Sequence, residues 1–183
     1  MRQSREEKAK THERIVQIAS TRIREAGIEG PGVAEIMEAA GLTHGGFYKH
    51  FGSRDDLIAE AADRAFAESD RTVQELTEGG EDPLAALVDW YLSTGHRDNP
   101  GTGCPVVALG GEISRGGDRV RASYRRQVER YLANLERLLG DRQRATVALS
   151  TLVGSVMLAR AVGDAPLSDE ILRDVRAALT AAD

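Results

Sequence analysis

The segment from Val33 to Phe51 constrains the fold more than any other part of the sequence, because it predicts two short helices joined by a tight turn. Apolar residues recur at helical spacing before Gly41, and glycine readily adopts the positive φ that such a turn needs. Phe47 and Phe51 stand four residues apart, so both side chains can face one core. The pattern therefore predicts a helix-turn-helix, whose second helix has the size to enter the major groove of DNA, about 12 Å wide.

Helical periodicity continues along the chain, whereas strand signals are poor: aromatic residues make up 4% and no window alternates cleanly. We expect an all-α fold of about nine helices. A compact unit over residues 1–55 is expected to precede a larger helical body over residues 56–183. The expected helices cover about residues 15–26, 33–40, 44–50, 54–77, 83–94, 105–114, 119–139, 142–162 and 169–181.

Local signals predict how some of these elements begin and end. Ser53, Thr43 and Ser168 are each expected to cap the helix that follows, because a serine or threonine oxygen accepts a free backbone N–H there. The segment 96–103 is rich in Pro, Gly and Asn and is expected to be a mobile loop.

Composition excludes several classes of protein. No apolar run approaches the roughly 20 residues of a membrane-spanning helix. The charged N-terminus has no apolar core, so no secretory signal is expected and the cytoplasm is the expected location. Cys104 is the single cysteine and the four histidines lack metal-ligand spacing. We expect no disulfide within the chain, no metal, no cofactor and no membrane partner.

Charge is unevenly distributed along the sequence. The net charge is -5, yet residues 1–24 hold seven Lys and Arg against three acidic residues. A basic arm on an acidic body can steer one face of the protein towards phosphate. The alternative is an ordinary solvated and frayed terminus.

The second helix of the predicted pair offers polar side chains suited to DNA. Thr43 stands at its N-terminus, where its hydroxyl and the free amides can hold a phosphate. His44 is the best placed to reach a base edge, while Tyr48, Lys49 and His50 offer donors to the DNA backbone. The alternative is a plain helical hairpin with an exposed polar face.

Two consecutive glycines interrupt this helix. Gly45 and Gly46 each cost helix stability, roughly 1 kcal/mol relative to alanine. Such a pair is easier to understand if DNA, or a neighbouring helix, approaches the backbone closely.

Many residues in this region agree at fixed spacing with one known pattern: Gly27-Ile-Glu-Gly, Val33, Ile36, Ala39-Ala-Gly41-Leu-Thr, Gly45, Phe47-Tyr48, His50-Phe51, Ser53-Arg54-Asp55 and Leu57. With these residues, the ungapped segment from about Ile15 to Leu57 resembles the N-terminal domain of the TetR/AcrR family of transcriptional regulators. The resemblance implies a three-helix DNA-binding domain and a helical ligand-binding domain. It also implies a homodimer that binds a palindromic operator in double-stranded DNA and usually represses.

The resemblance also assigns roles by position. Thr43, Tyr48, His50 and Arg54 fall where the family contacts phosphates. His44, Gly46 and Lys49 fall at variable positions that face the bases or the DNA backbone, with Gly45 between them.

Two positions depart from the family pattern. Pro31-Gly32 stand where the second helix usually begins with Thr or Ser, so that side chain's phosphate contact is lost. Gly46 replaces a residue that often carries a small hydroxyl or methyl group. These departures leave open an alternative, a helical interaction protein that kept the fold and lost specific DNA binding.

The C-terminal half carries a dimerisation and a ligand-binding expectation. Wide apolar stripes mark the last two long helices, and an isologous homodimer through them is the natural arrangement, with burial inside one subunit as the alternative. An unidentified small-molecule effector is expected between the middle helices. The candidate lining residues are Trp90, Tyr91, Cys104, Tyr124, Tyr131 and Met157, each of which is otherwise ordinary core.

Cys104 precedes a predicted helix in a Gly-Cys-Pro sequence. A helix N-terminus stabilises a thiolate, and some family members sense oxidants or electrophiles through a cysteine in a similar setting. The alternatives are a small buried apolar residue and, remotely, an enzyme nucleophile with His96 as its base and Asp98 as the nearest orienting acid. We expect no enzyme. Release from DNA would follow ligand binding or Cys104 modification, through the helix that begins near residue 54.

Overall fold

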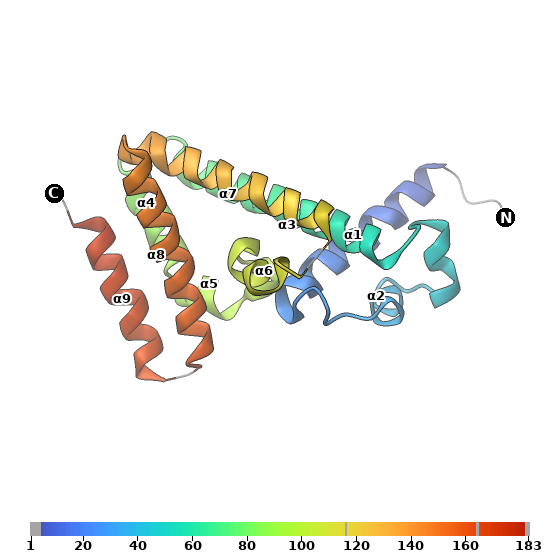
Figure 1. The fold of residues 1–183 in the computed structure, drawn as a ribbon. Helices are drawn as coiled ribbons and strands as arrows, with labels where there is room; N and C mark the ends of the chain where they lie inside the picture. Colours follow the sequence, from blue (N-terminus) through green and yellow to red (C-terminus); the bar gives the residue numbers. More distant parts are fainter. Residues whose placement is uncertain (1–4, 116, 164, 182–183) are drawn as a thin grey trace.

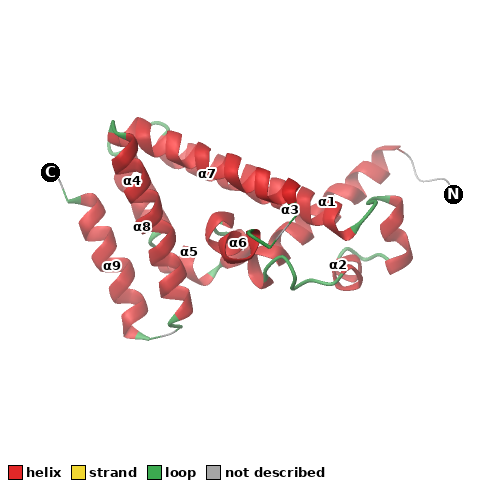
Figure 2. Ribbon diagram, viewed as in Figure 1, coloured by secondary structure: helices red, strands yellow, loops and turns green. Residues whose placement is uncertain are grey.

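The computed structural model describes residues 5–115, 117–163 and 165–181, which form nine α-helices and two short 3-10 helices without a strand (Figures 1 and 2). The all-α prediction is therefore confirmed for this part of the chain. The elements are α1 (Arg5–Ala26), α2 (Val33–Ala39), η1 (His44–Lys49), α3 (Arg54–Thr77), α4 (Pro83–Tyr91), α5 (Thr94–Asp98), η2 (Pro100–Thr102), α6 (Pro105–Ile113), α7 (Asp118–Leu139), α8 (Arg142–Ala161) and α9 (Pro166–Thr180).

The helices form an elongated molecule with an N-terminal helix-turn-helix domain at one end (Figure 1). α3 and α7 pack side by side along its length, and α1 packs against the first half of α3. α8 and α9 form an adjacent pair at the other end, and the short α6 contacts α1, α3, α7 and α8. α3 therefore connects the helix-turn-helix to the larger helical domain, and α6 lies between them.

One hydrophobic core runs through both domains. It includes Ile15 and Phe47 near the helix-turn-helix, Phe66 on α3, Leu109 on α6 and Leu152 on α8, each at most 2% exposed. A continuous core of this kind transmits a displacement of one helix to its neighbours, because close-packed side chains leave little room to relax.

The start of α3 agrees with the cap predicted at Ser53. Its Oγ accepts a hydrogen bond from the backbone N–H of Asp56 at 3.1 Å. Asp55 and Asp56 lie in the first turn, where the helix dipole favours acidic side chains. These local interactions define where α3 begins.

The prediction of a mobile loop over 96–103 was wrong. Ser93 caps α5, since its Oγ accepts from the N–H of His96 at 3.1 Å, and Asn99 closes the same turn by donating to the carbonyl of Gly95 at 2.8 Å. η2 follows directly, with Pro100 at its first position. Capping side chains outweigh the loop-like composition here.

The predicted cap at Ser168 was also wrong. α9 begins two residues earlier, at Pro166, whose fixed φ suits the first position of a helix. Ser168 is buried, and its Oγ donates to the carbonyl of Ala159 at 2.8 Å and accepts from Arg97 at 2.9 Å. Its hydroxyl therefore joins α9 to α8 and α5 and does not cap the start of a helix.

The basic N-terminal segment is helical from Arg5 onwards. Lys10 and Glu6, one turn apart, form an exposed ion pair at 2.6 Å. The expectation of a frayed terminus is thus wrong for residues 5–24, while residues 1–4 lie outside the described part of the chain.

Candidate nucleic-acid interface

The turn of the helix-turn-helix is built on Gly41, whose φ is +69°. Its N–H donates to the carbonyl of Glu38 and the N–H of Leu42 to that of Met37, both at 2.8 Å. This pair of bonds is the Schellman arrangement, which satisfies the last carbonyls of α2 and needs a left-handed residue at its centre. The turn predicted at Gly41 is present for the reason that the sequence suggested.

The second helix of the pair, η1, is a 3-10 helix. The N–H of Gly46 donates to the carbonyl of Thr43 at 2.9 Å, three residues back. Phe47 is 2% exposed and its ring stacks on that of Phe51, with centroids 5.4 Å apart. Two glycines disfavour a regular α-helix, and the two rings anchor the segment to the core.

The predicted DNA-facing residues lie on the outer side of this anchored segment. Thr43, His44, Gly45 and Lys49 are exposed, and Tyr48 is 73% exposed, the largest value among the exposed large hydrophobic side chains of the described residues. Thr43 precedes η1, and the cap predicted there was wrong because its side chain makes no capping hydrogen bond. Its hydroxyl is therefore available to a ligand at the N-terminus of η1.

Gly45 and Gly46 have no tight internal packing. A Cβ added at Gly45 would meet no atom within 4 Å, and one at Gly46 would lie 3.5 Å from Cε of Met37, an ordinary contact. Neither glycine has a positive φ. The suggestion that a neighbouring helix requires these glycines is therefore wrong.

His50 is half-buried at the end of η1. Burial lowers the pKa of its imidazole below the usual value, and electrostatic interaction with His12, Lys8 and Lys49 lowers it further. Its Nδ1 atom is buried without a hydrogen-bond partner among the described residues. The lowered pKa favours the neutral form of the imidazole.

Arg54 has partners within the protein. Its Nη2 donates to the carbonyl of Ile28 at 2.6 Å and to that of Pro31 at 3.4 Å. It therefore holds the connection between α1 and α2 against the start of α3. A phosphate contact by this residue would use the remaining donors of the guanidinium group.

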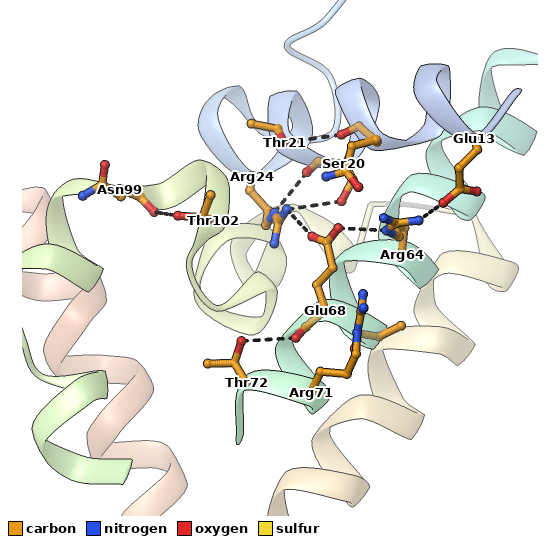
Figure 3. A network of polar contacts seen from close by, with 12 residues as sticks. Glu13, Ser20, Thr21, Arg24, Arg64, Glu68, Arg71, Thr72, Asn99 and Thr102 are labelled. Carbon is orange, nitrogen blue, oxygen red and sulfur yellow. Dashed lines mark hydrogen bonds and ion pairs between the residues drawn. The ribbon is translucent and has the colours of Figure 1, made fainter. Parts of the chain in front are cut away.

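A network of charged side chains joins α1 to α3 (Figure 3). Arg24 is 4% exposed, and its guanidinium donates to Glu68 at 2.8 Å and to the carbonyl of Ser20 at 3.1 Å. Glu68 also accepts from Arg64 at 2.8 Å, and Arg64 in turn binds Glu13 of α1. Burial alone would raise the pKa of Glu68, but the bonds from Arg64 and Arg24 lower it.

Comparison with known proteins agrees with this geometry. The sequence profile of the family described as bacterial regulatory proteins, tetR family, matches residues 15–61. An uncharacterised HTH-type transcriptional regulator of Mycobacterium tuberculosis is 32% identical over an alignment of 189 positions, which covers 92% of this chain and 94% of that protein. The chain belongs to the tetR family of bacterial regulators.

More distant relatives share part of the sequence or the fold of this tetR-family regulator. The HTH-type transcriptional repressor DhaR of Mycobacterium sp. (strain GP1) is 25% identical over 65% of this chain and 60% of its own length. A TetR regulator from Chloroflexus aurantiacus superposes with a TM-score of 0.82 at 24% identity, over 95% of this chain and 94% of that one. Reduced NemR from Escherichia coli gives 0.79 at 21% identity, over 93% and 95%.

In the larger domain of this regulator, three of the predicted ligand-binding residues lie together. Sγ of Cys104 donates to Oη of Tyr131 at 3.8 Å, and Tyr131 also bonds to Ser69 of α3. Oη of Tyr91 is buried without a hydrogen-bond partner among the described residues. Burial, and then the charge of a Cys104 thiolate, raise the pKa of both tyrosines, so both phenols are protonated near neutral pH.

Of the other three predicted lining residues, Trp90 lies beside this cluster, with its ring centroid 6.0 Å from that of Tyr91. Trp90 stacks on His96 with ring centroids 4.7 Å apart, and Tyr124 donates to the carbonyl of Val106 at 3.0 Å. Burial raises the pKa of Tyr124 to about 12. Met157 is 53% exposed on α8, so its expected place in an internal pocket was wrong. Helical periodicity shows that such a residue shares a face with others, but it does not show what covers that face.

His96 is the member of this cluster whose role the sequence did not reveal. Its Nε2 accepts from the backbone N–H of Cys104 at 2.9 Å, so its Nδ1 carries the proton and donates to the carbonyl of Tyr91 at 2.6 Å. Burial lowers its pKa to about 4. Both ring nitrogens are engaged with the backbone, so His96 is not placed as a base for the Cys104 thiol. The hypothesis of a cysteine-dependent enzyme therefore lacks the general base that it assigned to His96.

Two further predictions concern what is absent. Among the described residues, no group of three or more potential ligands could hold a metal ion. In the same part of the chain, no helix combines the length and hydropathy needed to cross a membrane.

Proposed function

We propose that this regulator is a repressor that binds a palindromic operator as a homodimer and leaves it when a small molecule binds, or when Cys104 is modified, in the larger domain. The observation that carries the proposal is η1: it is anchored by Phe47 and Phe51 and presents Thr43, Tyr48 and Lys49 to solvent. A short segment fixed from behind, with polar donors in front, suits the major groove and its flanking phosphates.

The exposed surface of α8 and α9 supports dimerisation. Large apolar side chains are unusually exposed there, between 38% and 59%: Val147, Met157, Leu158, Val162 and Leu167. All of them except Leu167 belong to α8 or directly follow it. An apolar surface on an adjacent helix pair suits a second copy of the same pair. Such a dimer would place two helix-turn-helix units on one DNA duplex.

The polar cluster of Tyr91, Cys104 and Tyr131 supports an effector site. A small cavity of about 20 Å³ lies beside it, lined by both tyrosines and by apolar residues that include Val73 and Leu152. That volume is little more than one water molecule needs, so an effector would have to enlarge it. Displacement of the surrounding helices on binding is the step that would reach the DNA-binding domain.

Cys104 itself is 1% exposed at the start of α6, so a modifying reagent reaches it only when the surrounding elements move aside. If it is a sensor, N-ethylmaleimide at a concentration that releases DNA should add its mass to Cys104. Release without an adduct would rule out the thiol as the trigger and leave non-covalent binding.

A gel-shift titration tests the proposed function. The DNA is the segment upstream of the chain's own coding sequence, and a scrambled duplex of equal length is the control. We expect binding that prefers the upstream DNA and that weakens steeply with added salt. Equal binding to both duplexes, or none at low salt, would contradict the proposal and favour an interaction protein without DNA specificity.

A further inference from the structure

The connection between α1 and α2 receives a hydrogen bond from a distant part of the chain. Oε2 of Glu112, near the end of α6, accepts from the backbone N–H of Ile28 at 2.7 Å. The two residues are 84 positions apart in sequence. Gly27 leaves the room for this contact: its φ is +81°, and a Cβ added there would collide with the Glu112 carboxylate.

The same peptide segment is held from the opposite side by the DNA-binding domain. Arg54, the first residue of α3, donates to the carbonyl of Ile28 at 2.6 Å. Ile28 thus has its N–H bound to the larger domain and its carbonyl bound to the helix that follows η1. We call Glu112, the Ile28 backbone and Arg54 the interdomain clamp.

α6 joins this clamp to the cluster around Cys104. The helix has nine residues, and Cys104 is its N-cap. At 1.5 Å per residue, the Cys104 and Glu112 ends lie about 12 Å apart along the helix. The Cys104 end is tied to α8, since Cys104 N–H binds His96, whose carbonyl accepts from Arg160 at 2.8 Å. A shift of α6 at one end therefore moves the carboxylate at the other.

We propose that Glu112 is a positioning residue for operator binding, which acts by holding the Ile28 peptide and so the orientation of α2 and η1 relative to α1. The inference rests on the proposed DNA binding. A connection held from both sides has little conformational freedom left to lose when η1 enters the groove, so the clamp favours binding. Loss of the Glu112 hydrogen bond, whether by mutation or by displacement of α6, weakens operator binding.

Glu112→Ala tests the inference, with Glu112→Gln as a variant that keeps the side-chain volume and one acceptor oxygen. Glu29→Gln is the matched control, because Glu29 is exposed in the same connection and its substitution removes the same charge near the DNA. Amide hydrogen exchange of residues 27–30 in the free protein measures the clamp directly. Affinity for the upstream DNA and for a scrambled duplex measures the effect of the clamp on DNA binding.

In Glu112→Ala we expect exchange at Ile28 to accelerate at least tenfold and specific affinity to fall about tenfold, which corresponds to about 1.4 kcal/mol. Scrambled-duplex affinity should stay within twofold, Glu112→Gln should lie between the alanine variant and the wild type, and Glu29→Gln should show neither effect. If Glu112→Ala does not fold, the glutamine variant alone must show both effects.

Two results overturn the inference alone: unchanged exchange at Ile28, or faster exchange with specific affinity within twofold of the wild type. The latter would make Glu112 a purely structural residue. A wild-type protein that does not distinguish the two duplexes would instead overturn the proposed function, and the inference with it.

Discussion

Gly41 and Gly45 are glycines for different reasons. Gly41 needs its positive φ to close the turn, whereas Gly45 has a negative φ and open space around it. The sequence alone predicted the turn at Gly41 because its position fixes its role. It did not show whether a neighbouring helix packs against Gly45, since only the positions of the surrounding atoms answer that question.

Substitution of Gly45 by alanine should separate folding from DNA binding. Folding stability should be unchanged or rise by up to about 1 kcal/mol, because alanine favours the helix and meets no clash. Operator affinity should fall, because the added methyl group would face the DNA. Thermal unfolding and gel shifts measure the two effects. Gly41→Ala, the control, should instead lose about 1 kcal/mol of stability.

We expect Lys49 to bind DNA through its positive charge alone. Replacing it with alanine removes one phosphate contact, so affinity should fall for all sequences alike, and the slope of log K against log salt should flatten by about 1. Arg137→Ala, an exposed change at the far end of α7, should alter neither quantity. An unchanged slope in Lys49→Ala would remove this residue from the interface.

At the scale of elements, the Arg24–Glu68 ion pair joins α1 to α3. Helical periodicity predicted that both helices exist, but not that a nearly buried arginine on one meets a glutamate on the other. The contact joins residues 44 positions apart, and no local pattern encodes such a distance. The same holds for the Glu112 hydrogen bond to Ile28.

Local capping signals predicted the start of α3 at Ser53 correctly. They failed at Ser168, because α9 begins at Pro166.

Glu68→Gln should destabilise the protein by about 3 kcal/mol near neutral pH, because it leaves the buried Arg24 without its counter-charge. The pKa of Glu68 is lower in the folded chain than in the unfolded one, so its contribution is complete above the unfolded value and is lost as pH falls through the folded one. The gap between variant and wild type should therefore narrow in acid. Urea unfolding at several pH values measures this.

The control for that series is Glu75→Gln, an exposed change on the same helix. It should leave both the stability and its pH dependence unchanged. A Glu68→Gln variant as stable as the wild type at neutral pH would show that α1 and α3 are held by apolar packing alone.

At the scale of the molecule, the family resemblance covered only the N-terminal quarter, and the structure shows how the remainder is attached to it. The larger domain reaches α1 through α6 and η2 and continues into α3. The sequence placed an apolar stripe on the last helices, but exposure of Leu158 and Met157 appears only once the helices are packed.

Leu158→Glu should disrupt the proposed homodimer, because it places a charge in an apolar contact surface. Light scattering after gel filtration should shift from about twice 19.8 kDa to the monomer mass of 19.8 kDa. Ala133→Glu on α7, also exposed, should remain dimeric. A wild-type protein that elutes as a monomer at micromolar concentration would contradict the dimer.

The most direct test of a dimeric operator-binding protein is selection of bound duplexes from a random DNA library. We expect enrichment of a palindromic site whose two half-sites are spaced by about one helical turn of DNA or a multiple of it. Lys49→Ala should retain the selected sequence at lower affinity. Enrichment of no sequence, or of a single half-site without a partner, would contradict the account.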